Sequence, residues 1–122
     1  MDAEQAIHSF WSSFGIPAYD EYSVPDESAL PYITYSLSYD SFGESVSMAA
    51  SIWYRSISWE KITAKAHEVI AAIGRGGTQI HLDNGAIWVK LGTPAYQRVD
   101  SGNSDIRRIY ININAEYITN EL

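Results

Sequence analysis

The sequence contains no cysteine, which excludes a disulfide framework, a thiolate metal site and a cysteine nucleophile. It also lacks any apolar run approaching the roughly 18 residues that a membrane-spanning helix needs. The N-terminus carries Asp2 and Glu4, where a signal peptide needs a basic region followed by an apolar one. We therefore expect a protein that stays soluble where it is made and has no membrane partner.

An excess of charge is absent too, because apolar residues make up 46% and charged residues 19% of the 122-residue chain. This composition is typical of globular proteins, and the length suffices for one hydrophobic core but not for two. The sequence therefore predicts a single domain that spans residues 1–122.

Lysine and arginine are absent from residues 1–54, and all eight basic residues lie between Arg55 and Arg108. The same N-terminal stretch holds eight acidic residues: Asp2, Glu4, Asp20, Glu21, Asp26, Glu27, Asp40 and Glu44. These acids either form a solvated surface or contact a basic surface, within the fold or on a neighbouring copy. The net charge of −7 argues against a protein that binds the phosphate backbone of nucleic acid.

A strand followed directly by a helix forms the centre of the predicted fold. Apolar side chains occupy every second position over residues 46–55, which indicates a half-buried strand. Over residues 59–73 they recur every three to four positions, which indicates an amphipathic helix. Ser56 or Ser58 can cap this helix, and Gly74 ends it.

Another helix is predicted near the N-terminus, where Asp2 and Gln5 have the spacing of a capping box. Gly15 ends it. Its apolar face consists of Ile7, Phe10, Trp11 and Phe14. These aromatic side chains must be covered either by the chain's own sheet or by another subunit.

Alternating patterns predict further strands at residues 32–39, 78–82, 86–91, 95–99 and 107–118. Residues 40–44 and Asn84-Gly85 are expected to be hairpin turns, and Gly92 with Pro94 a third turn. Residues 17–31 hold three prolines and are expected to be extended and irregular. The grouping predicts an α+β fold, mainly an antiparallel sheet sandwich with two helices packed on one face.

The sequence contains no motif that indicates a catalytic site or a metal-binding site. His8, His67 and His81 lack the short spacing that places two ligands on one metal ion. The glycine-rich residues 74–77 lead into a strand instead of a helix, and residues 100–105 lack the glutamate that completes a calcium loop. We therefore predict no catalytic residue, no cofactor and no metal site.

The order of the elements, together with three segments, carries a resemblance over nearly the whole chain. The segments are Leu30-Pro31-Tyr32-Ile33-Thr34-Tyr35, the unit from Ala49-Ala50-Ser51-Ile52-Trp53-Tyr54 to Gly74, and the closing strand at residues 108–118. In this order the chain resembles the small tail-terminator and tail-completion proteins of long-tailed bacteriophages. Members of that family are similar in being non-enzymatic α+β proteins that form a hexameric ring at the end of the tail tube.

The resemblance implies a structural virion protein that forms a homo-oligomeric ring, a hexamer, at the head-proximal end of the tail tube. There it stops tube polymerisation and joins the tail to the head. The implied partners are further copies of itself, the tail tube protein and a head–tail connector protein. Such a protein is made in the cytoplasm of the host bacterium and resides in the virion tail. Another head–tail connector component, a monomeric binding module and a small enzyme with an unrecognised pocket remain alternatives.

The predicted ring has a heterologous interface in which the acidic N-terminal half faces the basic C-terminal half of the next copy. Trp53 and Arg55 lie with Ser51 on the strand face opposite the helix, where another layer or a partner subunit covers them. The predicted subunit-interface residues are Trp11, Asp20, Glu21, Trp53 and Arg55.

Genomic DNA is expected to pass through the ring without tight binding, because lysine and arginine on a channel wall would hold its phosphates. Acidic or polar residues are therefore predicted to line the channel. They would come from residues 20–27, 40–44 or 100–105.

Overall fold

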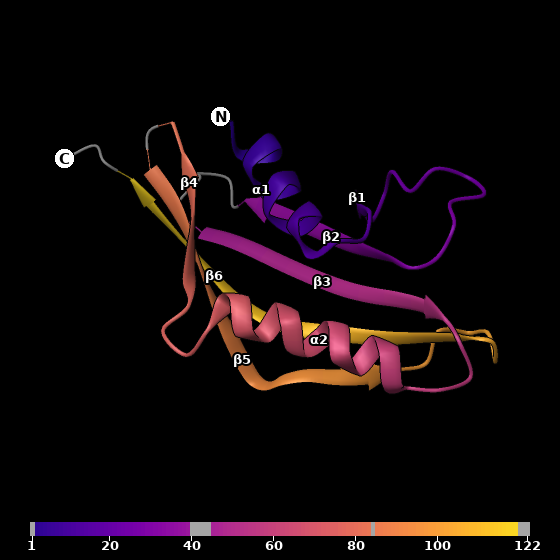
Figure 1. Cartoon of the computed structure of the whole chain (residues 1–122). Coiled ribbons are helices and arrows are strands. Elements are labelled where there is room, and N and C mark those ends of the chain that lie inside the picture. Colours follow the sequence, from indigo (N-terminus) through magenta and orange to yellow (C-terminus); the bar gives the residue numbers. More distant parts are fainter. Residues whose placement is uncertain (1, 40–44, 84, 120–122) are drawn as a thin grey trace.

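The computed structural model describes residues 2–39, 45–83 and 85–119, and Figure 1 shows the arrangement of its helices and strands. In chain order the elements are α1 (Ala3–Trp11), the 3₁₀ helix η1 (Ser12–Phe14), β1 (Ala18–Asp20), β2 (Tyr32–Tyr39), β3 (Ser45–Arg55), α2 (Glu60–Ile73), β4 (Thr78–Leu82), β5 (Gly85–Val99) and β6 (Ile106–Thr119).

All six strands belong to one sheet with the order β1-β2-β3-β6-β5-β4. Every neighbouring pair is antiparallel except β1 and β2, which are parallel. The predicted α+β class is confirmed, with a single curled sheet as the β layer. The predicted irregular segment at residues 17–31 was partly wrong, since it contains β1, which adds to the edge of β2.

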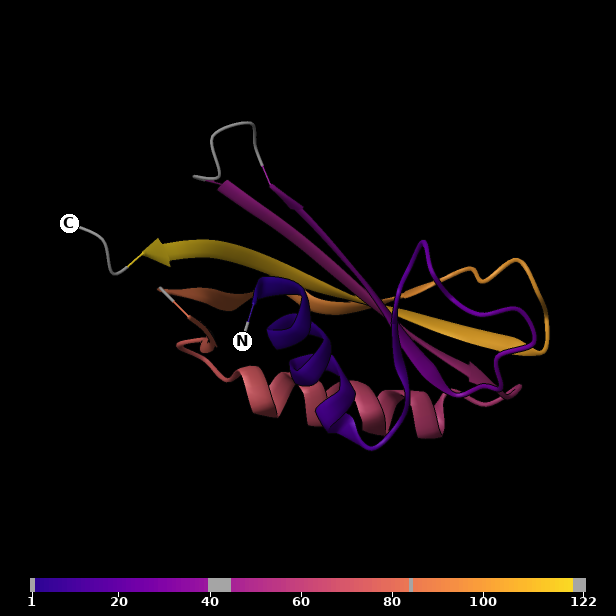
Figure 2. The same ribbon diagram turned by 90° about the horizontal axis from the view of Figure 1, so that it is seen from above.

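Both helices lie on the same face of the sheet, as the sequence predicted (Figure 2). α2 packs across β3, β5 and β6, whereas α1 contacts β1 and β4, which are the two edge strands. The sheet must therefore curl enough for one short helix to reach both of its edges. Side chains from both helices fill the space inside this curl.

The core consists of aliphatic side chains from the strands and α2 together with the aromatic face of α1. Burying one large apolar side chain contributes about 1.5 to 3 kcal/mol, so this shared core holds the helices against the sheet. Its largest fully buried members are Trp11, Ile7, Ile33, Ile52, Ile62, Ile73, Ile87, Ile109, Ile111, Val69 and Val89.

Trp11 belongs to this core and not to the predicted subunit interface. Its side chain has no exposed surface, and its ring lies edge-on to Phe10 at 4.9 Å and near Phe14 at 6.1 Å. The sequence left open whether the chain's own sheet or another subunit covers these aromatic side chains. The chain's own fold covers Trp11. A side chain without exposed surface cannot contact a partner, which corrects the assignment.

The helix ends follow local hydrogen bonding. Asp2 caps α1 as predicted, because its Oδ1 accepts a hydrogen bond from the Gln5 N–H at 2.9 Å. α2 begins at Glu60, whose N–H donates to Ser58 Oγ at 3.1 Å, although Trp59 holds the cap position itself. Gly74 ends α2 with a φ of +75°, a conformation that favours glycine.

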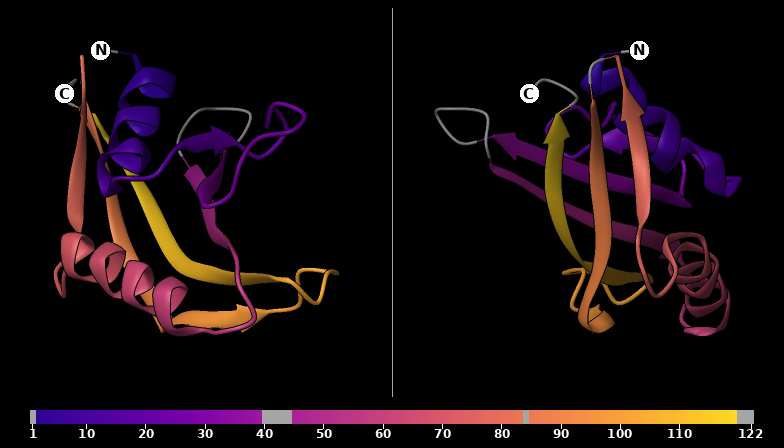
Figure 3. Two further views of the ribbon diagram at one scale, coloured as in Figure 1. Left: turned by 45° about the vertical axis from the view of Figure 1, so that its right-hand side comes forward. Right: turned by 90° about the vertical axis from the view of Figure 1, so that its left-hand side faces the viewer.

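The turn predicted at Gly92 and Pro94 is not there, because residues 85–99 form one strand, β5. Both halves of β5 pair with β6, and residues 92–95 stand opposite Asn112 as an irregular bulge between the Leu91 and Tyr96 pairings. The bulge coincides with a bend in β5 (Figure 3). Two predicted turns, at residues 40–44 and at Asn84, lie wholly or partly outside the described residues.

Candidate functional site

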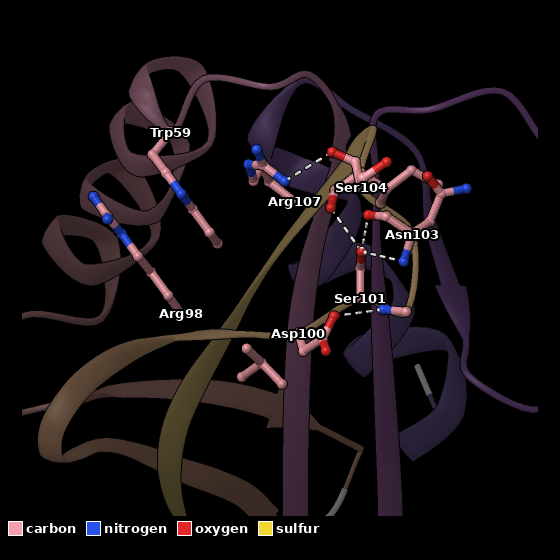
Figure 4. Close-up of a pocket in the computed structure, with 10 residues that line it drawn as sticks. Trp59, Arg98, Asp100, Ser101, Asn103, Ser104 and Arg107 are labelled. Carbon is pink, nitrogen blue, oxygen red and sulfur yellow. Dashed lines mark hydrogen bonds between the residues drawn. The ribbon is translucent and has the colours of Figure 1, made fainter.

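Two arginines stack on one tryptophan where β5 ends, β6 begins and α2 starts (Figure 4). The Arg98 guanidinium lies 4.6 Å from the centroid of the Trp59 ring, and the Arg107 guanidinium lies 5.3 Å from it. We call these three residues the arginine–tryptophan cluster. Each cation–π contact contributes about 0.5 to 1 kcal/mol at a partly exposed site, so the two contacts fix the orientation of the ring.

Arg107 is anchored more firmly than Arg98. Its Nη2 donates to the Ile57 carbonyl at 2.8 Å and its Nη1 to the Ser104 carbonyl at 3.1 Å. Its Nε is buried and has no hydrogen-bond partner among the described residues. The Arg98 guanidinium forms no hydrogen bond or ion pair within the same described part of the chain, so its donors are available to a ligand.

The loop between β5 and β6, residues 100–105, forms the opposite wall of a cavity of about 500 Å³. Its backbone is held by its own side chains: Asp100 Oδ1 accepts from the Gly102 N–H, and Asn103 Oδ1 from the Asp105 N–H, both at 2.8 Å. The Ser101 hydroxyl lies 2.6 Å from the Ile106 carbonyl oxygen. The loop is therefore a preformed wall.

The chemistry of this cavity suits the binding of an anion. Arginine matches the geometry of carboxylates and phosphates, with two parallel hydrogen bonds from one guanidinium. Asp100 lines the cavity and Asp105 lies in the same loop; both are exposed and form no ion pair with the arginines in the described part of the chain. Their charges make the rim less favourable for polyanions than for a single acidic side chain.

A further arginine–tryptophan contact lies on the opposite face of the sheet. Arg108 stacks on Trp53 at 4.7 Å and its Nε donates to Ser51 Oγ at 3.1 Å. Trp53 Nε1 donates to Thr34 Oγ1 at 2.9 Å. Trp53 is half-buried and Arg55 is exposed, and no described helix covers this face. Their predicted role at a subunit interface stays a prediction.

The predicted acidic interface residues lie in what we call the acidic segment, residues 20–27, which begins at the end of β1. Glu21 is exposed and Asp20 is half-buried, with its Oδ1 accepting a hydrogen bond from the Tyr22 N–H at 2.9 Å. The Tyr22 side chain is 86% exposed. A hydrogen bond to Glu21 and the charge of that carboxylate raise the pKa of Tyr22 above its ordinary value of 10.0.

The histidines do not converge on a site. His8 Nδ1 lies 3.1 Å from the Tyr35 hydroxyl, and His67 Nε2 lies 3.2 Å from the Tyr96 hydroxyl. Over the described ranges, no group of three or more histidine or acidic side chains is placed to hold a metal ion. No helix in those ranges is long and apolar enough to cross a membrane.

The sequence analysis missed the arginine–tryptophan cluster because it placed Trp59 on the apolar face of α2. A signal was nevertheless present in the strand pattern. Arg107 is in phase with Ile109 on β6, and Arg98 pairs with Ile109 across the β5–β6 ladder. Both arginines therefore occur on the face that carries the helices, where a charged side chain needs a partner.

No protein-family model matches this sequence, and no curated protein matches it. Among solved structures, the chain is similar to a chain from a structure described as the virion of a native gene transfer agent particle. The TM-score is 0.68 and the sequence identity 16%, and the alignment covers 96% of this chain and 95% of that chain. The two chains therefore share a fold along their whole length.

Proposed function

We propose that this protein is a structural virion component that forms a homo-hexameric ring at the head-proximal end of a phage tail tube. The ring stops tube polymerisation and joins the tail to the head. It contacts the tail tube protein on one side and a head–tail connector protein on the other. It is made in the bacterial cytoplasm and has no enzymatic activity.

The observation that carries this proposal is the full-length fold likeness to a chain of a virion. Coverage above nine-tenths of both chains supports an equivalent role as a virion subunit. The order of elements that the sequence shares with tail terminators supports the position at the end of the tube.

The surface chemistry supports self-assembly. The described ion pairs, Lys65–Glu68 and Lys90–Glu116, both lie within the C-terminal half. Neither pairs an acid of residues 2–27 with a base, so among the described residues these acids stay available to bases of other subunits. A heterologous ring needs two different patches on each subunit, and the acid-rich N-terminal residues are a candidate for one of them.

Electron microscopy of the purified protein, alone and with the tail tube protein encoded beside it, tests the proposal. We expect rings with a central opening, and tubes that are shorter and closed at one end when the protein is present during polymerisation. Binding to a head–tail connector without binding to tube ends would favour another connector component. A monomer that binds neither partner would refute the proposal.

A further inference from the structure

Among the described residues, two large apolar side chains are exposed, one in the acidic segment and one next to the arginine–tryptophan cluster. Tyr22 is 86% exposed and belongs to the acidic segment. Ile57 is 78% exposed, and its carbonyl accepts the hydrogen bond from Arg107 of the arginine–tryptophan cluster. An exposed apolar side chain surrounded by charge is the usual composition of a contact surface, with an apolar centre and a polar rim.

The charges of the two patches are complementary and are not used within the chain. The acidic segment contributes four carboxylates, Asp20, Glu21, Asp26 and Glu27, and the first 54 residues have no lysine or arginine to neutralise them. The cluster contributes Arg98 and Arg107, which form no ion pair within the described part of the chain. Figure 3, left, shows the segment after β1 and the β5–β6 loop on the same side of the molecule, with the segment above the loop.

The cluster has room and unused donors for a carboxylate. The cavity beside it measures about 500 Å³, and Arg98 lines it without a hydrogen-bond partner of its own in the described residues. The buried Nε of Arg107 also lacks a partner there. The accessible donors are therefore those of Arg98, because Nη1 and Nη2 of Arg107 already donate to backbone carbonyls.

We propose that the arginine–tryptophan cluster of one subunit receives the acidic segment of a second copy of this chain. Carboxylates of the segment face Arg98 and Arg107, and Tyr22 packs against Ile57. In the proposed ring this contact joins two different patches and repeats head to tail. This inference rests on the proposed ring and names the contact that closes it.

Nucleic-acid phosphate is the less favourable occupant. Asp100 lines the cavity, Asp105 lies in the same loop, and the whole chain carries a net charge of −7. A polyanion carries many negative charges, so the acidic groups near the cluster repel it more strongly than they repel a short acidic segment with one aromatic residue. The experiment below distinguishes the two occupants.

Charge reversal at both partners tests the contact by sedimentation velocity. Arg98→Glu and Glu21→Lys should each weaken self-association by at least about tenfold, because each places like charges opposite one another. An equimolar mixture of the two variants should associate better than either alone, because it restores opposite charges. Arg75→Glu is the matched control, since it makes the same charge change at an exposed position between α2 and β4.

Cysteine cross-linking gives an independent readout, because the natural chain has no cysteine. A mixture of Tyr22→Cys and Ile57→Cys chains should form a disulfide between the two variants under mild oxidation. Neither variant alone contains both partner positions. A dimer formed by Tyr22→Cys alone would instead indicate a symmetric contact and would overturn the head-to-tail arrangement.

The remaining outcomes are also decisive. Equal losses of self-association in Arg98→Glu and Arg75→Glu would indicate an effect of net charge and would contradict the contact. Unchanged association in both Arg98→Glu and Glu21→Lys would also contradict the contact, although the proposed ring could still form through other surfaces. If the wild-type protein binds duplex DNA and Arg98→Glu abolishes this binding, the cluster is a phosphate-binding site and the proposed contact is wrong. A wild-type monomer at all concentrations would overturn the contact, whereas failure to close tail tubes would count against the proposed function alone.

Discussion

Gly77→Ala is expected to destabilise the fold at the entry to β4. Gly77 has a φ of +83°, a conformation that residues with a Cβ rarely adopt. A Cβ built there would lie 2.5 Å from the Val89 carbonyl oxygen and 2.7 Å from Trp88 Nε1. The first of these atoms belongs to the backbone of β5 and cannot rotate away.

Two costs add at this position. The left-handed conformation costs a residue with a Cβ about 1 to 2 kcal/mol. Forcing an additional carbon into a packed site typically costs about 1 to 3 kcal/mol more, because neighbouring backbone must shift. The expected loss is therefore about 2 to 5 kcal/mol, a large part of the roughly 5 to 15 kcal/mol that stabilises a domain.

Chemical denaturation with circular dichroism measures this loss, and Gly76→Ala provides a matched control one residue away. A Cβ at Gly76 would have no heavy atom within 4 Å, and Gly76 has no positive φ. We expect the control to be neutral or stabilising by about 0.4 to 1 kcal/mol, because alanine restricts the unfolded chain. Equal stabilities of the two variants would refute the reasoning.

Other variants and conditions test the interface and the electrostatics. Trp53→Ala should weaken self-association in light scattering while circular dichroism still reports a folded chain, because Trp53 is only half-buried on the open sheet face; unfolding would place it in the core. A gel shift should detect no appreciable affinity for duplex DNA at physiological salt, and a salt-sensitive shift would contradict the predicted acidic or polar channel. Burial, with smaller effects of nearby carboxylates, raises the pKa of Tyr35 and of Tyr54 above 10.0, although Lys65 partly offsets the shift at Tyr54. The unfolded chain then loses these protons first as the pH rises, so the free energy of unfolding should fall above about pH 10, and Tyr54→Phe should reduce this fall in urea titrations.

The sequence predicted most elements because their signals are local. β3 and β6 alternate regularly, and each helix carries one apolar face, so periodicity alone located them. The local sequence does not determine which surface covers Trp11. An apolar helix face rich in aromatic residues needs a partner surface, and the same residues would serve equally well against the chain's own sheet or against another subunit. Only the curl that brings β1 and β4 to the same helix decides between them.

The interpretation of residues 92–94 as a turn failed for a related reason. Glycine and proline both interrupt strand ladders, so Gly92 and Pro94 indicate a turn when only their neighbours are considered. The two flanking segments nevertheless pair with the same strand, β6, and the extra residues become a bulge. A contact between distant parts of the chain therefore overrides the local preference.

The arginine–tryptophan cluster shows why the candidate functional site was harder to predict than the fold. Trp59 precedes α2, whereas Arg98 and Arg107 come from strands that are about forty residues further along the chain. The bulge in β5 is held by Asn112, whose Nδ2 donates to the Pro94 carbonyl at 2.6 Å.

Because the cluster draws on three separate elements, it exists only after α2, β5 and β6 have packed together. The acidic segment, by contrast, has its charges in the unfolded chain as well. A partly folded subunit thus carries the acidic partner without the cavity that receives it. Assembly through the proposed contact requires a folded subunit at every position, since one missing cluster leaves the next acidic segment unpaired and the ring open.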